Sequence, residues 1–281
     1  MSIIKWLLKI TGQILIFAFL TIFTQIGGLI YLLCKPLFKI LDKIKSQARR
    51  VFAKTLSFFF IYLVFTFLII PTIAKHFGRV PLPVIQQQAP LKPLNIFTCI
   101  LNRHYVTPTM KNVLMSNASK FVDKYPKSTI KYLDANFPFW NGFPLLPHLS
   151  HNDGKKVDLA FLYLNTKSKK QSNKTPSFFG YGVYEEPYPN EYNTPANCRK
   201  KGYWQYGILG RIVPQNKTKE LALDENRTKY LIKNLCQDNR VQKLFIEPHL
   251  KNRLLLSKYS KIRFHGCHAV RHDDHIHLQI N

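Results

Sequence analysis

Apolar residues are concentrated in two long runs near the start of the chain. The first extends from Gln13 to Leu33 and the second from Thr55 to Ala74, and neither contains an acidic or basic residue. Each run is close to the roughly 20 residues that a helix needs to cross a bilayer. A cleaved signal peptide would have a shorter apolar core and a small-residue cleavage site, which Cys34-Lys35-Pro36 does not provide. The pattern therefore predicts two retained transmembrane helices within residues 1–75.

The segment between the two runs is strongly basic. It contains a single acidic residue, Asp42, beside Lys35, Lys39, Lys43, Lys45, Arg49, Arg50 and Lys54. Only Lys5 and Lys9 precede the first run. Because an excess of positive residues marks the cytoplasmic side of a membrane protein, we expect this loop in the cytoplasm and both termini outside. The alternative is that the basic loop binds nucleic acid, but this does not explain why the charges lie directly beside two apolar runs.

A proline-rich segment follows the second run. Residues 76–95 contain four prolines and the run Gln86-Gln87-Gln88, a composition that predicts a semi-extended linker. Residues 96–281 are long enough for one ordinary domain with its own core. We expect this domain to be extracytoplasmic.

The apolar pattern of the domain mixes helical and strand periods. Helices are predicted near 109–123, 128–135 and 224–237, and strands at 158–164, 178–184, 203–213, 242–246 and 275–280. The elements do not alternate in a regular βαβ order. This indicates an α+β fold with a mostly antiparallel central sheet and flanking helices, preceded by the two transmembrane helices.

Charge and cysteine content indicate which partners and which disulfides to expect. The formal net charge is +26 over 281 residues, which suits an anionic partner. A nucleic-acid partner is not expected, because no aromatic and basic platform accompanies the charge. The four cysteines of the domain could form two disulfides in any of three pairings, or they could remain free thiols; they are Cys99, Cys198, Cys236 and Cys267. Cys34 is expected to be a free thiol.

The chain ends in a histidine-rich strand. In the sequence His272-Asp-Asp-His275-Ile-His277-Leu-Gln-Ile280, His275 and His277 project from one face of a strand, and the apolar residues project from the other. His272 cannot share that face by strand geometry, so it would come from a loop turned by Asp273 and Asp274. Two adjacent imidazoles suggest a metal site, although a chance cluster of histidines is the alternative.

A second motif supplies the partners that a metal site needs. In His148-Leu-Ser-His151-Asn-Asp-Gly154-Lys-Lys-Val-Asp158, the carboxylate of Asp158 heads an apolar strand, and Gly154 permits a sharp reversal of the preceding loop. Such a loop can bring His151 and Asp158 to one point. The alternative is an ordinary Asp-Gly turn with two surface histidines.

Together the two motifs resemble those of the penicillin-insensitive murein endopeptidases. These belong to a zinc peptidase group that includes D-Ala-D-Ala carboxypeptidases, lysostaphin-type enzymes and the Hedgehog signalling domain. The patterns H-x-x-H-x-x-G-x-x-x-D and H-x-x-H-x-H match here at every fixed position. The resemblance covers about residues 144–280 and is weaker in the middle. It implies that His151, Asp158 and His277 bind Zn²⁺, that His275 is a catalytic histidine beside the metal, and that His148 and His272 surround it.

The resemblance also implies an activity. We expect a membrane-anchored zinc metallopeptidase that hydrolyses D-amino-acid-containing cross-links of peptidoglycan on the outer, periplasmic side of the cytoplasmic membrane. The related carboxypeptidases have Glu or Asp where His272 stands, which places this chain nearer the endopeptidase branch. A D,D- or L,D-carboxypeptidase and a non-catalytic zinc-stabilised module that binds the wall remain alternatives.

Overall fold

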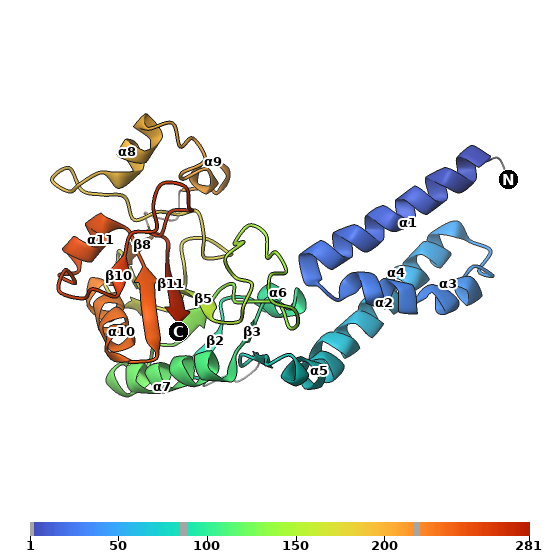
Figure 1. Ribbon diagram of the computed structural model, residues 1–281, viewed down its shortest axis with the longest axis horizontal. Helices are drawn as coiled ribbons and strands as arrows, with labels where there is room; N and C mark the ends of the chain where they lie inside the picture. Colours follow the sequence, from blue (N-terminus) through green and yellow to red (C-terminus); the bar gives the residue numbers. More distant parts are fainter. Residues whose placement is uncertain (1–2, 85–88, 216–219) are drawn as a thin grey trace.

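A helical hairpin and a mixed α/β domain make up the described residues, 3–84, 89–215 and 220–281, of this computed structural model (Figure 1). The hairpin consists of α1 (Ile3–Thr24), α2 (Gly27–Leu33), α3 (Lys35–Leu41), α4 (Gln47–Val64), the π-helical segment η1 (Phe65–Ile69) and α5 (Ile70–His76). Two of its helices, α1 and the continuous helix from α4 through α5, are long and apolar enough to cross a membrane. The predicted number of candidate spans is thus confirmed.

The first apolar run is not one helix, because the chain reverses between α1 and α2. Gln25 adopts a positive φ of 65° at the reversal. Directly after it, Gly27 and Gly28 allow α2 to pack closely on α1, since a Cβ on Gly28 would lie 2.0 Å from Oγ1 of Thr21. The helix α2 then runs back beside α1, and α3 continues in the same direction beside α4 (Figure 1).

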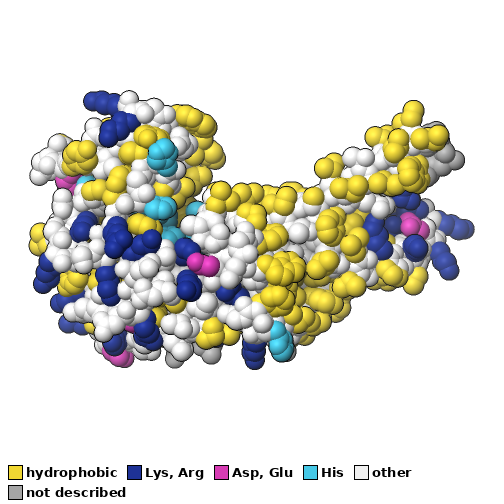
Figure 2. Space-filling model, in the orientation of Figure 1, with side chains coloured by type: hydrophobic (Ala, Val, Ile, Leu, Met, Phe, Trp, Pro, Cys, Tyr) yellow, Lys and Arg dark blue, Asp and Glu magenta, His cyan; other side chains and the backbone are white. Residues whose placement is uncertain are grey.

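This reversal changes the expected topology. The N-terminal end of α1 and the loop between α3 and α4 both lie at the end of the hairpin that is far from the domain (Figure 1). Apolar side chains cover the length of the hairpin, and basic side chains gather at this far end (Figure 2). The N-terminal end of α1 thus lies at the opposite end of the hairpin from the domain, whereas the sequence pattern predicts both termini on the outer side. The two lysines of α1 instead join the basic loop.

The hairpin is fixed to the domain by specific hydrogen bonds. The hydroxyl of Tyr62 donates to the carbonyl of Ile100 at 2.6 Å and accepts from Nδ2 of Asn102 at 2.9 Å. Oε1 of Gln25 accepts from the backbone N–H of Phe139 at 2.9 Å. The segment η1 lies just before Pro71, whose missing N–H explains a local widening of the helix there.

A six-stranded sheet with the order β10-β9-β11-β5-β4-β2 forms the centre of the domain. Its strands are β2 (Leu91–Pro93), β4 (Ile130–Tyr132), β5 (Lys156–Ala160), β9 (Val241–Phe245), β10 (Ile262–Arg263) and β11 (His275–Ile280). The central pairings are antiparallel, whereas β10 with β9 and β2 with β4 are parallel. The main sheet is therefore mixed, and the predicted mostly antiparallel sheet is not confirmed. Helical crossovers join the strands of each outer, parallel pair.

Smaller elements complete the domain. The remaining strands are β1 (Val80–Pro81), β3 (Tyr105–Val106), β6 (Tyr163–Asn165), β7 (Gln171–Ser172) and β8 (Leu221–Leu223). The helices are α6 (Ile96–Ile100), α7 (Pro108–Lys124), α8 (Thr194–Lys200), α9 (Leu209–Ile212), α10 (Glu225–Gln237) and α11 (Pro248–Arg253). The described parts of the proline-rich segment contribute β1 and β2, so they are extended and belong to the domain's sheets. The run Gln86-Gln87-Gln88 of the predicted linker lies outside the described residues.

One face of the main sheet is covered by α7 and α10. Ile276, Leu278 and Ile280 of β11 join the hydrophobic core with residues of these helices. Both helices were predicted, and each begins with a capping side chain, Thr107 for α7 and Asp224 for α10. The opposite face of β11 is left for the histidines, as the alternation of the strand predicts.

Three predicted elements differ from the structure. Residues 128–135 contain β4 in place of a helix. Residues 178–184 are irregular, because Gly180 and Gly182 have φ values of 84° and 83° that a strand does not accommodate. Residues 203–213 form turns and α9, with a positive φ of 85° at Gly207.

One disulfide links Cys198 of α8 to Cys267, eight residues before β11. Cys99 and Cys236 are buried free thiols, so the alternative of two disulfides is wrong. Cys34 is free, as predicted.

Candidate metal centre

The pairing of β5 with β11 places the central carboxylate. Asp158 lies directly opposite His277 in this antiparallel pair, so both side chains project from the same face. Oδ1 of Asp158 lies 2.9 Å from Nδ1 of His277. Asp158 is completely buried, and a buried carboxylate requires charge or hydrogen-bond compensation.

His151 reaches the same point from the loop before β5. The loop turns at Gly154, which has a φ of 77° and where a Cβ would lie 2.5 Å from the guanidinium of Arg79. Nδ1 of His151 lies 2.8 Å from the carbonyl of Ala135, which can only accept, so this nitrogen carries the proton. The lone pair of His151 is therefore on Nε2, and it faces Asp158 and His277.

The three donor atoms have the spacing of ligands around one ion. Nε2 of His151 lies 3.1 Å from Nδ1 of His277 and 3.3 Å from Oδ1 of Asp158. Bonds of about 2.0–2.2 Å to a tetrahedral zinc ion require ligand atoms about 3.3 Å apart. His151, Asp158 and His277 thus form a buried group that could hold a metal ion.

The protonation states of the group suit a divalent cation. Burial by itself raises the pKa of Asp158, but the imidazoles of His151 and His275 and hydrogen bonds outweigh it and hold this pKa well below the ordinary value. Burial lowers the pKa of His277 to about 4, although Asp158 opposes that shift. An ionised carboxylate and a neutral imidazole are the forms in which these groups bind metals.

His275 stands beside the group with its ring held by Asp274. Nδ1 of His275 is hydrogen-bonded to Oδ1 of Asp274, whose Oδ2 accepts from the backbone N–H of Gly182 at 2.6 Å. Nε2 of His275 then faces the centre, 3.7 Å from Oδ1 of Asp158. Burial lowers the pKa of His275, but Asp158 and Asp274 outweigh it and raise this pKa to about 9.

The two remaining predicted histidines border the same cluster. Nδ1 of His148 lies 3.0 Å from Oδ2 of Asp134 and 3.5 Å from Oδ2 of Asp158. The ring of His272 lies 5.0 Å from that of His275, and burial holds the pKa of His272 well below its ordinary value. All six residues singled out in the sequence therefore meet at one buried place.

Several supporting residues were not predicted. Tyr181 donates its hydroxyl hydrogen to Oδ2 of Asp158 at 2.9 Å, and Arg103 pairs with Asp134 at 3.0 Å. Glu247 accepts from the backbone N–H of His272 at 3.3 Å. In the sequence, the acidic Asp134 directly after the apolar Tyr132 and Leu133 could have indicated a polar residue at the end of a buried strand. Tyr181 gave no such signal, because it lies in a segment that was predicted to be a strand.

An apolar cavity of about 610 Å³ adjoins the cluster. His148 and Tyr181 line the side near the metal group, and Phe23 of α1 lines another side. Phe178 and Phe179, which also line it, are 58% and 60% exposed. The cavity thus adjoins both the candidate centre and the end of a candidate membrane helix.

Comparisons with known proteins do not assign the chain to a family. No protein-family model matches it, and no curated protein is similar to it in sequence.

Proposed function

We propose that this protein is a membrane-anchored zinc peptidase that hydrolyses cross-links in peptidoglycan. The observation that carries the proposal is the convergence of His151, Asp158 and His277 on one point at ligand spacing. Two neutral imidazoles and one carboxylate would leave a zinc ion positively charged and open at a fourth position, as in catalytic zinc sites. The motif resemblance to murein endopeptidases supplies the substrate class.

The surrounding residues fit peptide hydrolysis. A bound zinc ion would polarise the scissile carbonyl and lower the pKa of a bound water to about 7. His275 presents Nε2 toward the centre and would hold or transfer a proton at that atom, with Asp274 fixing its orientation. His272, kept neutral by burial, would accept or donate a hydrogen bond beside it.

The proposed compartment is outside the cytoplasmic membrane. It follows from the basic end of the hairpin, which the charge rule assigns to the cytoplasm, and from the position of the domain at the opposite end (Figure 1). Scattered lysine and arginine side chains on the visible face of the domain would attract an anionic wall polymer (Figure 2).

The test is to incubate the purified full-length protein with cross-linked murein and to separate the products. We expect cross-linked dimers to disappear with zinc present and to persist with a chelator or with His275→Ala. Unchanged dimers with stoichiometric zinc would refute the endopeptidase activity. Release of terminal D-alanine without cleavage of dimers would identify a carboxypeptidase. If His275→Ala preserved function while His277→Ala unfolded the domain, the site would be a structural zinc centre.

The apolar cavity favours one second candidate substrate. A peptide that is linked to a membrane lipid could place its hydrocarbon chain in the cavity beside Phe23, with the peptide bond near His275. The comparison of lipid-linked and soluble forms of the same peptide would test this candidate. Equal cleavage of both forms, unaffected by Phe179→Ser, would exclude it.

A further inference from the structure

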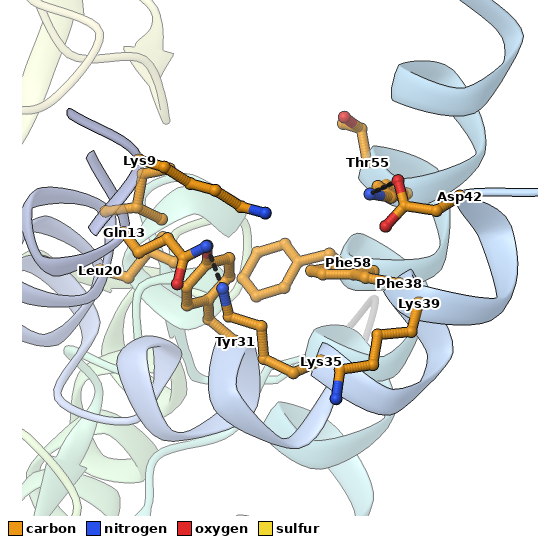
Figure 3. Close-up of a pocket in the computed structure, with 12 residues that line it drawn as sticks. Lys9, Gln13, Leu20, Tyr31, Lys35, Phe38, Lys39, Asp42, Thr55 and Phe58 are labelled. Atoms are coloured by element: carbon orange, nitrogen blue, oxygen red, sulfur yellow. Dashed lines mark hydrogen bonds and ion pairs between the residues drawn. The ribbon is translucent and has the colours of Figure 1, made fainter. Parts of the chain in front are cut away.

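A crevice of about 640 Å³ opens within the hairpin between α1, α2, α3 and α4 (Figure 3). Apolar and aromatic side chains line much of it, namely Ile16, Leu20, Phe38 and Phe58. Polar groups come from Gln13, Tyr31 and Thr55. It lies in the part of the chain that is apolar enough to enter a bilayer, remote from the candidate metal centre.

The crevice carries an uncompensated positive charge. Lys9, Lys35, Lys39 and Lys54 line it together with a single acid, Asp42, so its net charge is 4 − 1 = +3. Asp42 is the only acidic residue in the first 75 positions of the sequence. It is already paired with Nζ of Lys54 at 2.7 Å and with Nε of Arg50 at 3.9 Å.

Two of the three remaining lysines, Lys35 and Lys9, have different surroundings. Nζ of Lys35 donates to the hydroxyl of Tyr31 at 2.9 Å, a bond that leaves its charge uncancelled. Lys9 extends its amino group into the space between α1 and α4, on the side where Asp42 and Thr55 lie (Figure 3). Lysines near the end of a membrane helix reach the bilayer interface, where they attract anionic lipid headgroups. The crevice thus has more positive than negative groups, and it also offers apolar side chains for contact.

We propose that the crevice binds an anionic phospholipid. Its phosphate would lie among Lys9, Lys35 and Lys54, where lysine acts as a point charge for phosphate. Its acyl chains would follow Ile16 and Leu20 of α1 along the apolar surface, of which Ile16 is 47% exposed. The bound lipid would fill the space between α1 and α4 and hold the hairpin at the leaflet opposite the domain.

The test is a lipid titration of the full-length, delipidated protein in detergent, followed by native mass spectrometry. Phosphatidylglycerol should bind with one retained molecule, and phosphatidylcholine should not. The variant Lys9→Gln/Lys35→Gln should lose about fivefold in affinity for each lysine removed. The matched control Lys43→Gln/Lys45→Gln removes the same charge from exposed loop positions and should retain the wild-type affinity.

Two further arms keep the outcome decisive. Lys9→Arg/Lys35→Arg preserves the charge and should keep the lipid even if the glutamine variant folds poorly. Soluble glycerol phosphate, which lacks the chains, should not displace phosphatidylglycerol. An equal loss in the crevice and loop pairs, equal retention of both lipids, or displacement by glycerol phosphate would overturn the proposal.

Discussion

At the residue level, both oxygens of Asp158 are used. Oδ1 faces His151, His277 and His275, whereas Oδ2 accepts from Tyr181 and approaches His148. Removing a buried carboxylate from water is expensive unless its charge is compensated. The hydrogen bond from Tyr181 and the imidazole of His275, whose pKa is raised, provide part of that compensation. A bound cation would provide the rest.

Replacing Tyr181 should weaken the metal site without unfolding the domain. Tyr181→Phe removes the hydrogen bond to Oδ2 of Asp158 but preserves the ring. Outer partners of metal ligands are typically worth about 10- to 100-fold in metal affinity. We therefore expect zinc affinity, measured by competition with a chelator, to fall by at least about tenfold. An unchanged affinity would mean that Tyr181 does not orient the carboxylate.

Glu185 should make stability depend on pH in the neutral range. Burial raises the pKa of its carboxyl from 4.5 to about 7, against the opposing charge of Arg253. The folded state thus retains a proton that the unfolded state loses between about pH 4.5 and 7, so stability falls as the pH rises through this window.

Glu185→Gln removes this proton difference and is the matched test. Its melting temperature relative to the wild type should rise as the pH is increased from about 4.5 to 7, and then level off. A difference that is constant across the window would contradict the raised pKa.

At the level of elements, the sequence predicts the two strands of the site, β5 and β11, but not the irregular segment 178–184 that borders it. The alternation of His275 and His277 with Ile276 and Leu278 defines which face of β11 is polar, and Gly154 marks the reversal before β5. Each is a local signal. The segment 178–184, which contains Tyr181, is irregular because of its glycine conformations and its contacts with distant residues. Its strand-like composition therefore led to a wrong prediction of a strand.

The disulfide should stabilise the segment around α8. Cys198 and Cys267 are separated by 69 residues, and closing a loop of that length in the unfolded chain is worth about 4 kcal/mol in the chain-entropy account. Cys198→Ser should therefore lower the free energy of unfolding by up to about that amount, as measured by denaturant titration. Cys236→Ser is the control: reductant should still destabilise it, whereas Cys198→Ser should no longer respond.

At the level of the whole molecule, hydrogen bonds that are buried or partly buried join the hairpin to the domain. Tyr62 and Gln25 of the hairpin bond to Ile100 and Phe139 of the domain. The sequence predicted the two spans from length and apolarity alone. Length and apolarity do not predict the reversal at Gln25, because the reversal depends on one positive φ and on close helix contact at Gly27 and Gly28.

The direction of α1 gives a topology prediction. With an impermeant thiol reagent, Lys127→Cys in the domain should react in cells with an intact cytoplasmic membrane. Lys5→Cys and Lys45→Cys should react only after permeabilisation. Lys5 belongs to the first turn of α1 and Lys45 to the loop between α3 and α4, and both of these segments lie at the far end of the hairpin (Figure 1). Labelling of Lys5→Cys together with Lys127→Cys would contradict this arrangement of α1.

The most direct test of the central claim is the zinc content of the purified full-length protein. We expect one zinc per chain in the wild type and almost none in Asp158→Asn, because that change removes the only carboxylate of the ligand group. Asp153→Asn is the matched control, since Asp153 lies in the same loop but pairs with Lys156, and it should keep full occupancy. Full zinc occupancy in Asp158→Asn, or no zinc in the wild type, would contradict the proposed metal centre.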